Sequence, residues 1–227
     1  MKISALNQNS ISFSDLKSKF TQVTKRSADI AISLTAIVAF TPLLAYTAYK
    51  IKQEDKGPIL FKQQRSGLNN IPFEIYKFRS MKVKKQQLPS ERVEDLYAYF
   101  GQRVPDDFIF KTLESNNPNV TQVGRWIRKY SVDELPQLFN VLKGEMSIVG
   151  PRPEIVAITK YYDAEQLKRL KVKPGITGWA QVNGRSEINH GLKIKYDIYY
   201  VNNESVWLYF KIIGMTLIQV LQGKGSV

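Results

Sequence analysis

Residues 131–153 read SVDELPQLFNVLKGEMSIVGPRP, and this stretch carries the most information about the fold and chemistry of the chain. Two adjacent carboxylates, Asp133 and Glu134, precede an apolar segment that predicts a helix. After that segment comes a turn in which Arg152 lies between two prolines that restrict its backbone. Carboxylates before a helix and a rigidly held arginine after it form a layout suited to chemistry on a phosphate group.

The carboxylate pair has two interpretations. Ser131 and Glu134 have the spacing of a capping box, and the helix dipole favours acidic residues in the first turn of any helix. Pro136 would be poorly tolerated as the fifth helical residue, so a helix that starts nearer Asp133 is easier to form. An exposed Asp133 at a helix N-terminus would keep a low pKa, and the same terminus attracts phosphate. A carboxylate that faces a bound phosphate can act as a nucleophile.

Composition limits the possible functions. The chain has 227 residues, enough for one or two domains, and its net charge of +13 with a pI near 9.7 indicates an anionic partner. Nucleic acid, acidic lipid headgroups and phosphorylated substrates all fit that charge. The sequence contains no cysteine and a single histidine, His190. Catalysis would therefore depend on carboxylates, lysines, arginines and hydroxyls.

Residues 30–49 carry no charge and would rise about 30 Å as a helix, which is one hydrocarbon thickness. A transmembrane helix and a buried core helix both fit; a cleaved signal peptide is disfavoured by the long polar stretch before the run. Pro42 lies inside the run and predicts a break that leaves each half too short to cross. Basic residues flank both ends, so charge gives no orientation. Arg26 and Asp29, one turn apart, are expected to pair.

Residues 1–24 are rich in Ser, Asn, Gln and Lys and predict a frayed or interfacial lead-in. Beyond the membrane segment, residues 59–61 and 73–78 have strand character, and residues 67–70 between them predict the turn of a small β-hairpin.

The rest of the chain is predicted to be mainly helical, which gives an α+β fold. Residues 82–118 are polar and charged and predict an insertion with a short helix near Val93–Phe100. Residues 131–142 and 154–172 predict two helices. Residues 206–221 are almost wholly apolar, and the few polar residues on one side predict a helix lying in a membrane interface.

Several motifs resemble the bacterial sugar transferases, the small monotopic phosphoglycosyl transferases that prime glycan assembly on a polyprenyl phosphate. The resemblance covers about residues 22–222 and is most specific in residues 131–153. The other matching stretches are GPILFKQQRSG at 57–67, YKFRSM at 76–81, KPGITGWAQVNGR at 173–185, and Asp197 with Tyr200-Val201. Departures from the family pattern are Thr41, Asn117, Asn119 and Tyr209.

The resemblance implies a mechanism. Asp133 would attack the β-phosphate of a UDP-sugar to give a phosphosugar-enzyme and UMP, and Asp133 and Glu134 would hold Mg²⁺. Thr41-Pro42 stands where the family has the Ser-Pro break of its re-entrant helix. The residues predicted to bind substrate are Lys77, Arg79, Arg125, Arg128, Arg152, Gln181 and Arg185.

The resemblance also implies a location and partners. Residues 25–52 would form a re-entrant membrane helix, and residues 53–222 a catalytic domain on the cytoplasmic side of the bacterial inner membrane. The expected partners are a UDP-sugar, undecaprenyl phosphate, the membrane and a further copy of the chain, with no nucleic acid. Two other hypotheses stay open: an inactive scaffold of a glycan-assembly complex, and a basic membrane-associated nucleic-acid-binding protein.

Overall fold

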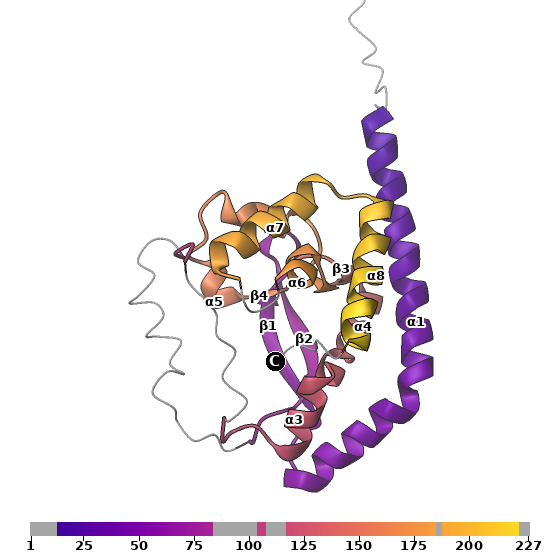
Figure 1. Cartoon of the computed structure of the whole chain (residues 1–227), viewed down its shortest axis with the longest axis vertical. Coiled ribbons are helices and arrows are strands. Elements are labelled where there is room, and N and C mark those ends of the chain that lie inside the picture. Colours follow the sequence, from indigo (N-terminus) through magenta and orange to yellow (C-terminus); the bar gives the residue numbers. More distant parts are fainter. Residues whose placement is uncertain (1–12, 84–103, 108–116, 185–187, 223–227) are drawn as a thin grey trace, which may run out of the picture.

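The computed structural model describes residues 13–83, 104–107, 117–184 and 188–222. A long helix, α1 (Phe13–Asp55), runs along one side of the molecule, and the other elements pack against it (Figure 1). The helix begins within the predicted lead-in, and the predicted helix in residues 93–100 lies outside the described ranges. The α+β class is confirmed, with helices predominant.

Helix α1 continues through Pro42, so the expected break into two helices is absent. Proline removes one helical hydrogen bond, and Figure 1 shows a bend toward the C-terminal end of α1. The Thr41 hydroxyl donates to the Ile37 carbonyl at 2.7 Å, a contact that commonly accompanies such a bend. By length and composition, α1 is the one helix in the described ranges that is long and apolar enough to cross a membrane.

Residues on both sides of the apolar segment of α1 contact the same folded body. Before the segment, Lys25 Nζ donates to Tyr200 OH at 2.8 Å, and Asp29 accepts from the Ile148 amide at 2.8 Å. At the other end, Asp55 pairs with Arg79. The segment between these anchors stays against the body: Ser33 and Thr47 are fully buried, and Ile37 and Leu44 pack on the core.

The expected pairing of Arg26 with Asp29 is not formed. The Arg26 guanidinium instead donates to the carbonyls of Val141 and Leu142, at 2.5 and 2.8 Å. These carbonyls lie in the last turn of α4 (Gln137–Lys143), where a cation also interacts favourably with the negative end of the helix dipole. Tertiary packing thus gave Arg26 a better partner than the neighbour one turn away.

The predicted hairpin is confirmed. Strands β1 (Leu60–Ser66) and β2 (Pro72–Phe78) pair antiparallel, joined through the 3₁₀ turn η1 (Leu68–Asn70). Asn70 in the turn adopts a positive φ of 63°, a conformation that asparagine tolerates. The short strand β4 (Glu154–Ile155) adds to β1 and gives the sheet order β2-β1-β4.

The single helix predicted for residues 131–142 is wrong. The chain forms α3 (Gln122–Lys129), then the 3₁₀ turn η2 (Val132–Glu134), and then α4, for which Pro136 is the N-cap. Proline is suited to the start of a helix and not to its interior, so the helix restarts there.

Two further strands follow α4. Strands β3 (Ser147–Val149) and β5 (Gly175–Thr177) pair parallel. A Cβ on Gly175 would lie 2.0 Å from the Gly150 nitrogen, so close backbone approach requires glycine in both motifs.

The long helix predicted for residues 154–172 is also wrong. Residues 154–155 join the sheet, a short helix α5 (Val156–Thr159) follows, and the 3₁₀ helix η3 (Gln166–Lys171) is separate. Asp163 and Gln166 cause the restart, because each side chain accepts the backbone N–H of the other, at 2.8 and 3.2 Å. This reciprocal pair is the geometry of a capping box.

The C-terminal part consists of α6 (Trp179–Asn183), α7 (His190–Asn202) and α8 (Val206–Leu221). Helix α8 has the bounds that the sequence predicts. On its polar side Lys211 is exposed, while Gln219 is partly buried and donates to the Val182 carbonyl at 2.8 Å. The outer face of α8 is apolar and includes Leu217, Ile218 and Leu221.

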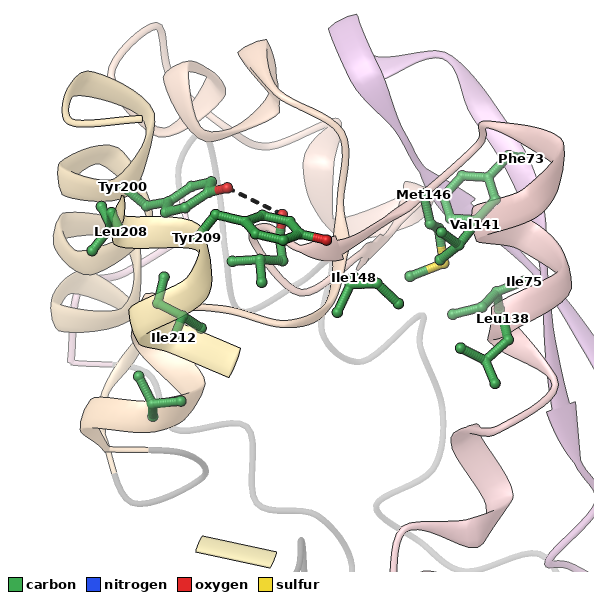
Figure 2. Close-up of a cluster of buried hydrophobic side chains, with 12 residues drawn as sticks. Phe73, Ile75, Leu138, Val141, Met146, Ile148, Tyr200, Leu208, Tyr209 and Ile212 are labelled. Atoms are coloured by element: carbon green, nitrogen blue, oxygen red, sulfur yellow. Dashed lines mark hydrogen bonds between the residues drawn. The ribbon is translucent and has the colours of Figure 1, made fainter. Parts of the chain in front are cut away.

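Figure 2 shows the main core, where side chains of α8, α7 and β3 meet those of α4 and the hairpin. Tyr209, Ile212, Val141 and Met146 are fully buried there. Tyr200 is also buried, and its hydroxyl donates to the Val149 carbonyl at 3.2 Å. This core fixes α4 and β3, the two elements that flank the carboxylate pair and the Arg152 turn.

Candidate active site

The carboxylate pair lies on the 3₁₀ turn η2, between α3 and α4. Ser131 precedes it in a left-handed conformation with φ 54°, and the Ser131 side chain makes no capping hydrogen bond to this turn. The Glu134 amide donates to the Ser131 carbonyl at 3.1 Å instead. The capping-box interpretation is therefore wrong, and both carboxylates are available for other contacts.

Glu134 is buried and holds two cations on one oxygen. Lys77 Nζ from β2 and an Arg152 guanidinium nitrogen donate to Glu134 Oε1, at 2.9 and 2.8 Å. Burial by itself would raise the pKa of Glu134, but the charges of Arg152 and Lys77 hold it well below its usual range. Glu134 is thus a permanent anion that fixes the position of both cations.

Asp133 has a different environment. Its Oδ1 is buried and has no hydrogen-bond partner among the described residues. Burial and the adjacent Glu134 charge raise the pKa of Asp133 to about 6, although Lys77, Arg152 and Arg128 act in the opposite direction. The predicted low pKa of Asp133 is wrong, because the carboxylate is half-buried beside a second anion rather than exposed at a helix end.

A small pocket opens beside the pair. The polar residues that line it are Arg65, Lys77, Gln137 and Arg152. Three of these four side chains are cationic, so the pocket is suited to an anion that carries more than one charge.

Arg65 is a site residue that sequence reasoning missed. Its NH1 donates to the Pro153 carbonyl at 3.3 Å, and its Nε is buried without a partner in the described part of the chain. Burial and the Arg152 charge lower the pKa of Arg65, opposed by the charges of Glu154 and Glu134. The hairpin register contains a signal for Arg65. Arg65 pairs with Phe73, and Phe73 lies four residues before Lys77 on β2, so Arg65 and Lys77 lie on the same face of the sheet.

Arg128 lies on α3, which packs against η2, and its charge acts to lower the pKa of Asp133. Arg79 lies elsewhere: it is buried, paired with Asp55, and donates to the Pro58 carbonyl at 2.5 Å, so it ties the hairpin to the end of α1. Arg125 is exposed on α3 and makes a weak contact with the Val120 carbonyl at 3.5 Å.

Two predicted substrate-binding residues come from the 173–185 motif. The Gln181 side-chain oxygen and nitrogen are both buried, and neither has a hydrogen bond to a described residue. The amide lies against Gly178, where a Cβ would be 2.6 Å from Gln181 Oε1. Arg185 lies outside the described residues.

The metal prediction can be tested against the donors present. No group of three or more His, Cys, Asp or Glu side chains gathers within the described ranges. Asp133 and Glu134 do offer adjacent carboxylates, and Asp133 Oδ1 lacks a partner. Mg²⁺ commonly uses one or two carboxylates and completes its shell with water and substrate phosphates, so these residues fit that ion when a phosphorylated substrate is bound.

The fold and site define a class of protein: an α+β body tied to a long apolar helix, with two adjacent carboxylates among cations. The chain belongs to the bacterial sugar transferase family, whose family model matches residues 20–223.

Three relatives illustrate the family. The chain is 39% identical to an undecaprenyl-phosphate glucose phosphotransferase of Komagataeibacter xylinus, over 88% of this chain and 36% of that protein. It is 38% identical to an undecaprenyl-phosphate galactose phosphotransferase of Salmonella typhimurium, over 93% and 43%. It is 37% identical to the uncharacterized sugar transferase EpsL of Bacillus subtilis, over 89% and 90%. The chain thus spans less than half the length of the first two relatives.

Proposed function

We propose that this protein transfers a sugar-1-phosphate from a UDP-sugar to a polyprenyl phosphate, with UMP as the second product. The observation that carries the proposal is the contrast within the carboxylate pair. Glu134 is an anion held by Lys77 and Arg152, while the neighbouring Asp133 Oδ1 is buried beside a cationic pocket and has no hydrogen bond to any residue that the structure describes. A nucleophile needs such a free oxygen, and a diphosphate needs such cations.

The proposed reaction has two displacements at the same phosphorus. A carboxylate oxygen of Asp133 bonds to the β-phosphorus of the UDP-sugar, the bond from that phosphorus to the oxygen bridging it to the α-phosphate breaks, and UMP leaves. An oxygen of the polyprenyl phosphate then attacks the phosphorus, and the bond to Asp133 breaks. The product is a polyprenyl-diphosphate-sugar, and the Asp133 carboxylate is regenerated.

Lys77 and Arg152 contribute to the reaction because they are held in place before the substrate binds. Lys77 and Arg152 are fixed by Glu134 before substrate arrives, so little reorganisation is needed when charge shifts between phosphate oxygens. Arg65 and Arg128 add positive charge on either side. Mg²⁺ held by Asp133 and Glu134 would neutralise further charge on the diphosphate when it is bound.

We also propose that α1 enters one membrane leaflet and returns, with the site at headgroup depth on the cytoplasmic face of the bacterial inner membrane. Two observations support this arrangement. The contacts of Lys25 and Asp55 tie both ends of the apolar segment of α1 to the same body. Large apolar side chains also face outward from α1 and from α8, which packs against it (Figure 1); they include Leu34, Val38, Leu217 and Leu221.

The reaction is tested by screening a panel of UDP-sugars for UMP release in the presence of undecaprenyl phosphate. We expect release with at least one donor, loss of release in EDTA, and recovery with Mg²⁺. Full activity in excess chelator would remove the proposed metal. Retention of DNA with a steep salt dependence, and no UMP release with any donor, would favour a nucleic-acid-binding protein instead.

The membrane arrangement is tested with single cysteines, which report cleanly because the sequence has none. Gln22 and Gln53 are exposed on either side of the apolar segment of α1. In intact cells, Gln22→Cys and Gln53→Cys should both resist a membrane-impermeant thiol reagent, and both should react after lysis. Labelling of Gln22→Cys alone in intact cells would mean that α1 spans the membrane. Pro42→Leu should shift the protein toward that form.

A further inference from the structure

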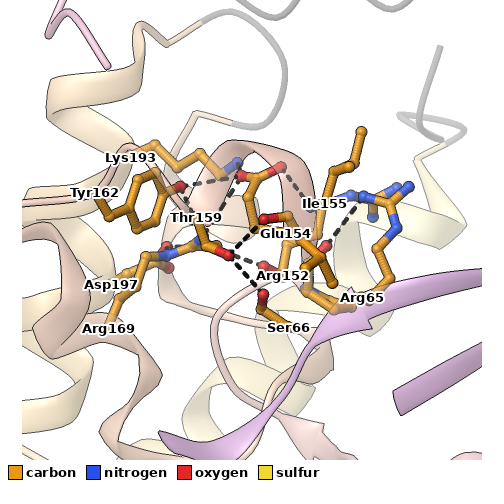
Figure 3. A network of polar contacts seen from close by, with 12 residues as sticks. Arg65, Ser66, Arg152, Glu154, Ile155, Thr159, Tyr162, Arg169, Lys193 and Asp197 are labelled. Atoms are coloured by element: carbon orange, nitrogen blue, oxygen red, sulfur yellow. Dashed lines mark hydrogen bonds and ion pairs between the residues drawn. The ribbon is translucent and has the colours of Figure 1, made fainter. Parts of the chain in front are cut away.

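Arg169, in η3, is the centre of a buried polar network (Figure 3). Its side chain is completely buried, and it pairs with Asp197 of α7, with Nε and NH2 at 2.8 and 2.7 Å from Asp197 Oδ2. NH1 lies 3.5 Å from Glu154 Oε2 and 3.3 Å from the Tyr162 hydroxyl. A buried arginine of this kind is stable only with such partners.

The network balances its charges. Lys193 of α7 donates to Glu154 Oε2 at 2.8 Å, so two cations face the two carboxylates Glu154 and Asp197. Burial and the charge of Arg169 act in opposite directions on the pKa of Asp197, and burial prevails, so its pKa is raised. The network needs no ligand to balance its formal charges.

One contact connects this network to the active site. Arg169 NH2 donates to the backbone carbonyl of Arg152 at 2.9 Å. The next carbonyl, that of Pro153, accepts from Arg65 at 3.3 Å, and the following residue, Glu154, pairs with Ser66 in the sheet. The backbone around Arg152 is therefore held at three consecutive residues, while the Arg152 side chain extends to Glu134.

The contacts need an arginine. A guanidinium presents five N–H donors in one plane. The edge formed by Nε and NH2 binds Asp197, and NH2 also donates to the Arg152 carbonyl. A lysine at this position could keep the ion pair with Asp197 but has one nitrogen for all the acceptors.

We propose that Arg169 is a positioning residue that aims Arg152 at Glu134 by holding the Arg152 carbonyl, with Asp197 and Glu154 holding Arg169 in turn. The effect on turnover rests on the proposed function, but the effect on the conformation of Arg152 does not. The prediction is therefore a loss of order at the Arg152 side chain when Arg169 is replaced, whatever reaction the protein catalyses.

The first experiment measures that order. Full-length protein in detergent, labelled with ¹⁵N-arginine, gives side-chain Nε–H signals, and Arg152→Lys identifies the signal of Arg152. We expect Arg169→Lys to broaden or shift this signal, while Lys168→Met, which removes an exposed neighbour paired with Glu165, leaves it unchanged. An unchanged Arg152 signal in folded Arg169→Lys overturns the proposal. Asp197→Asn, measured in the same way, provides a second variant should Arg169→Lys fail to fold.

The second experiment measures turnover per folded molecule. We expect Arg169→Lys to lower kcat for UMP release by about 100-fold with little change in KM, because a small misplacement of a catalytic group has an effect of that size. In an Arg152→Ala background the same change should lower kcat by no more than about threefold, since the residue it positions is gone. Equal losses in both backgrounds would show a general structural role and overturn the proposal. A wild-type protein inactive with every donor would refute the proposed function, and the NMR comparison would still decide the role of Arg169.

Discussion

Two buried glutamates near the Arg152 turn, Glu154 and Glu134, both pair with cations but differ in what surrounds the ion pairs. Glu154 belongs to a closed network in which Arg169 and Lys193 face Glu154 and Asp197. Glu134 belongs to an open cluster in which cations gather around the carboxylate pair and line a pocket beside it. The first group is balanced by protein alone, and the second has capacity for an added anion.

The difference shows how to separate a structural ion network from a functional one. Burial and opposite charge shift pKa values in both groups, so a shifted pKa by itself does not mark a site. Asp197 Oδ1 of the closed network is also buried without a hydrogen-bond partner among the described residues, so what marks the Glu134 cluster is the adjoining pocket and the excess of cations. Four predictions test this distinction, and the three on catalysis are given in order of decreasing effect.

The largest effect is expected at Asp133. Asp133→Asn should lower turnover by at least about 10⁴-fold, because an amide does not attack phosphorus. Incubation with a labelled UDP-sugar should leave label on wild-type protein and none on the variant. Substantial activity in purified Asp133→Asn would refute the assignment of the nucleophile.

The same variant should be more stable than wild type at neutral pH. The folded-state pKa of Asp133, about 6, lies above its ordinary value of 3.8, so folding opposes ionisation and stability is lost as pH rises through that window. Asp133→Asn removes this penalty, at most about 3 kcal/mol, and should raise Tm by several degrees at pH 7. The gain should vanish below pH 4, and a gain that persists there would contradict the electrostatic cause.

An intermediate effect is expected when one cation of the open cluster is removed. Arg152→Ala should lower kcat by about 10²–10³-fold, the usual cost of losing a group that stabilises developing charge. Arg125→Ala is the matched control, because the structure places this arginine on the exposed face of α3 rather than in the pocket. Similar losses in both variants would mean that net positive charge, and not the Glu134 cluster, supports the reaction.

The smallest effect is the pH dependence. Asp133 must be ionised to attack, so kcat/KM should rise about tenfold per pH unit below 6 and level off above it. Below about pH 6 most of the Asp133 carboxyl is protonated and cannot attack, so kcat/KM falls as the pH is lowered. A rate–pH profile measured with wild type should show this rise and the plateau above it. A profile that is flat from pH 5 to 8 would contradict a nucleophile with a raised pKa.

Local sequence signals predicted some elements well. The hairpin and α8 have strong patterns, alternation around a turn in one and a continuous apolar run after a capping serine in the other. The helix predicted for 154–172 failed because Glu154 is needed in the sheet beside Ser66. The Asp163–Gln166 pair, whose spacing was present in the sequence, marks the restart and could have been recognised.

The candidate site was predicted in part. The family motifs pointed to the carboxylate pair, Lys77 and Arg152, which the structure places in hydrogen-bond contact through Glu134. They also pointed to Arg79, whose partner Asp55 lies 24 residues earlier at the end of α1. That partnership depends on how α1 packs along the body, which no local pattern encodes.

The sequence by itself determined the chemistry that is possible: a basic chain without cysteine, one long apolar segment, and adjacent carboxylates followed by an arginine between prolines. Only the tertiary structure decided how that chemistry is distributed. It buried Asp133 beside Glu134 and so raised the pKa of Asp133, and it enclosed Arg169 and Asp197 while leaving Arg65 beside the pocket. The physical reason is that residue type sets the charge, whereas burial and the nearest opposite charge, which come from distant parts of the chain, set whether that charge is available to a ligand.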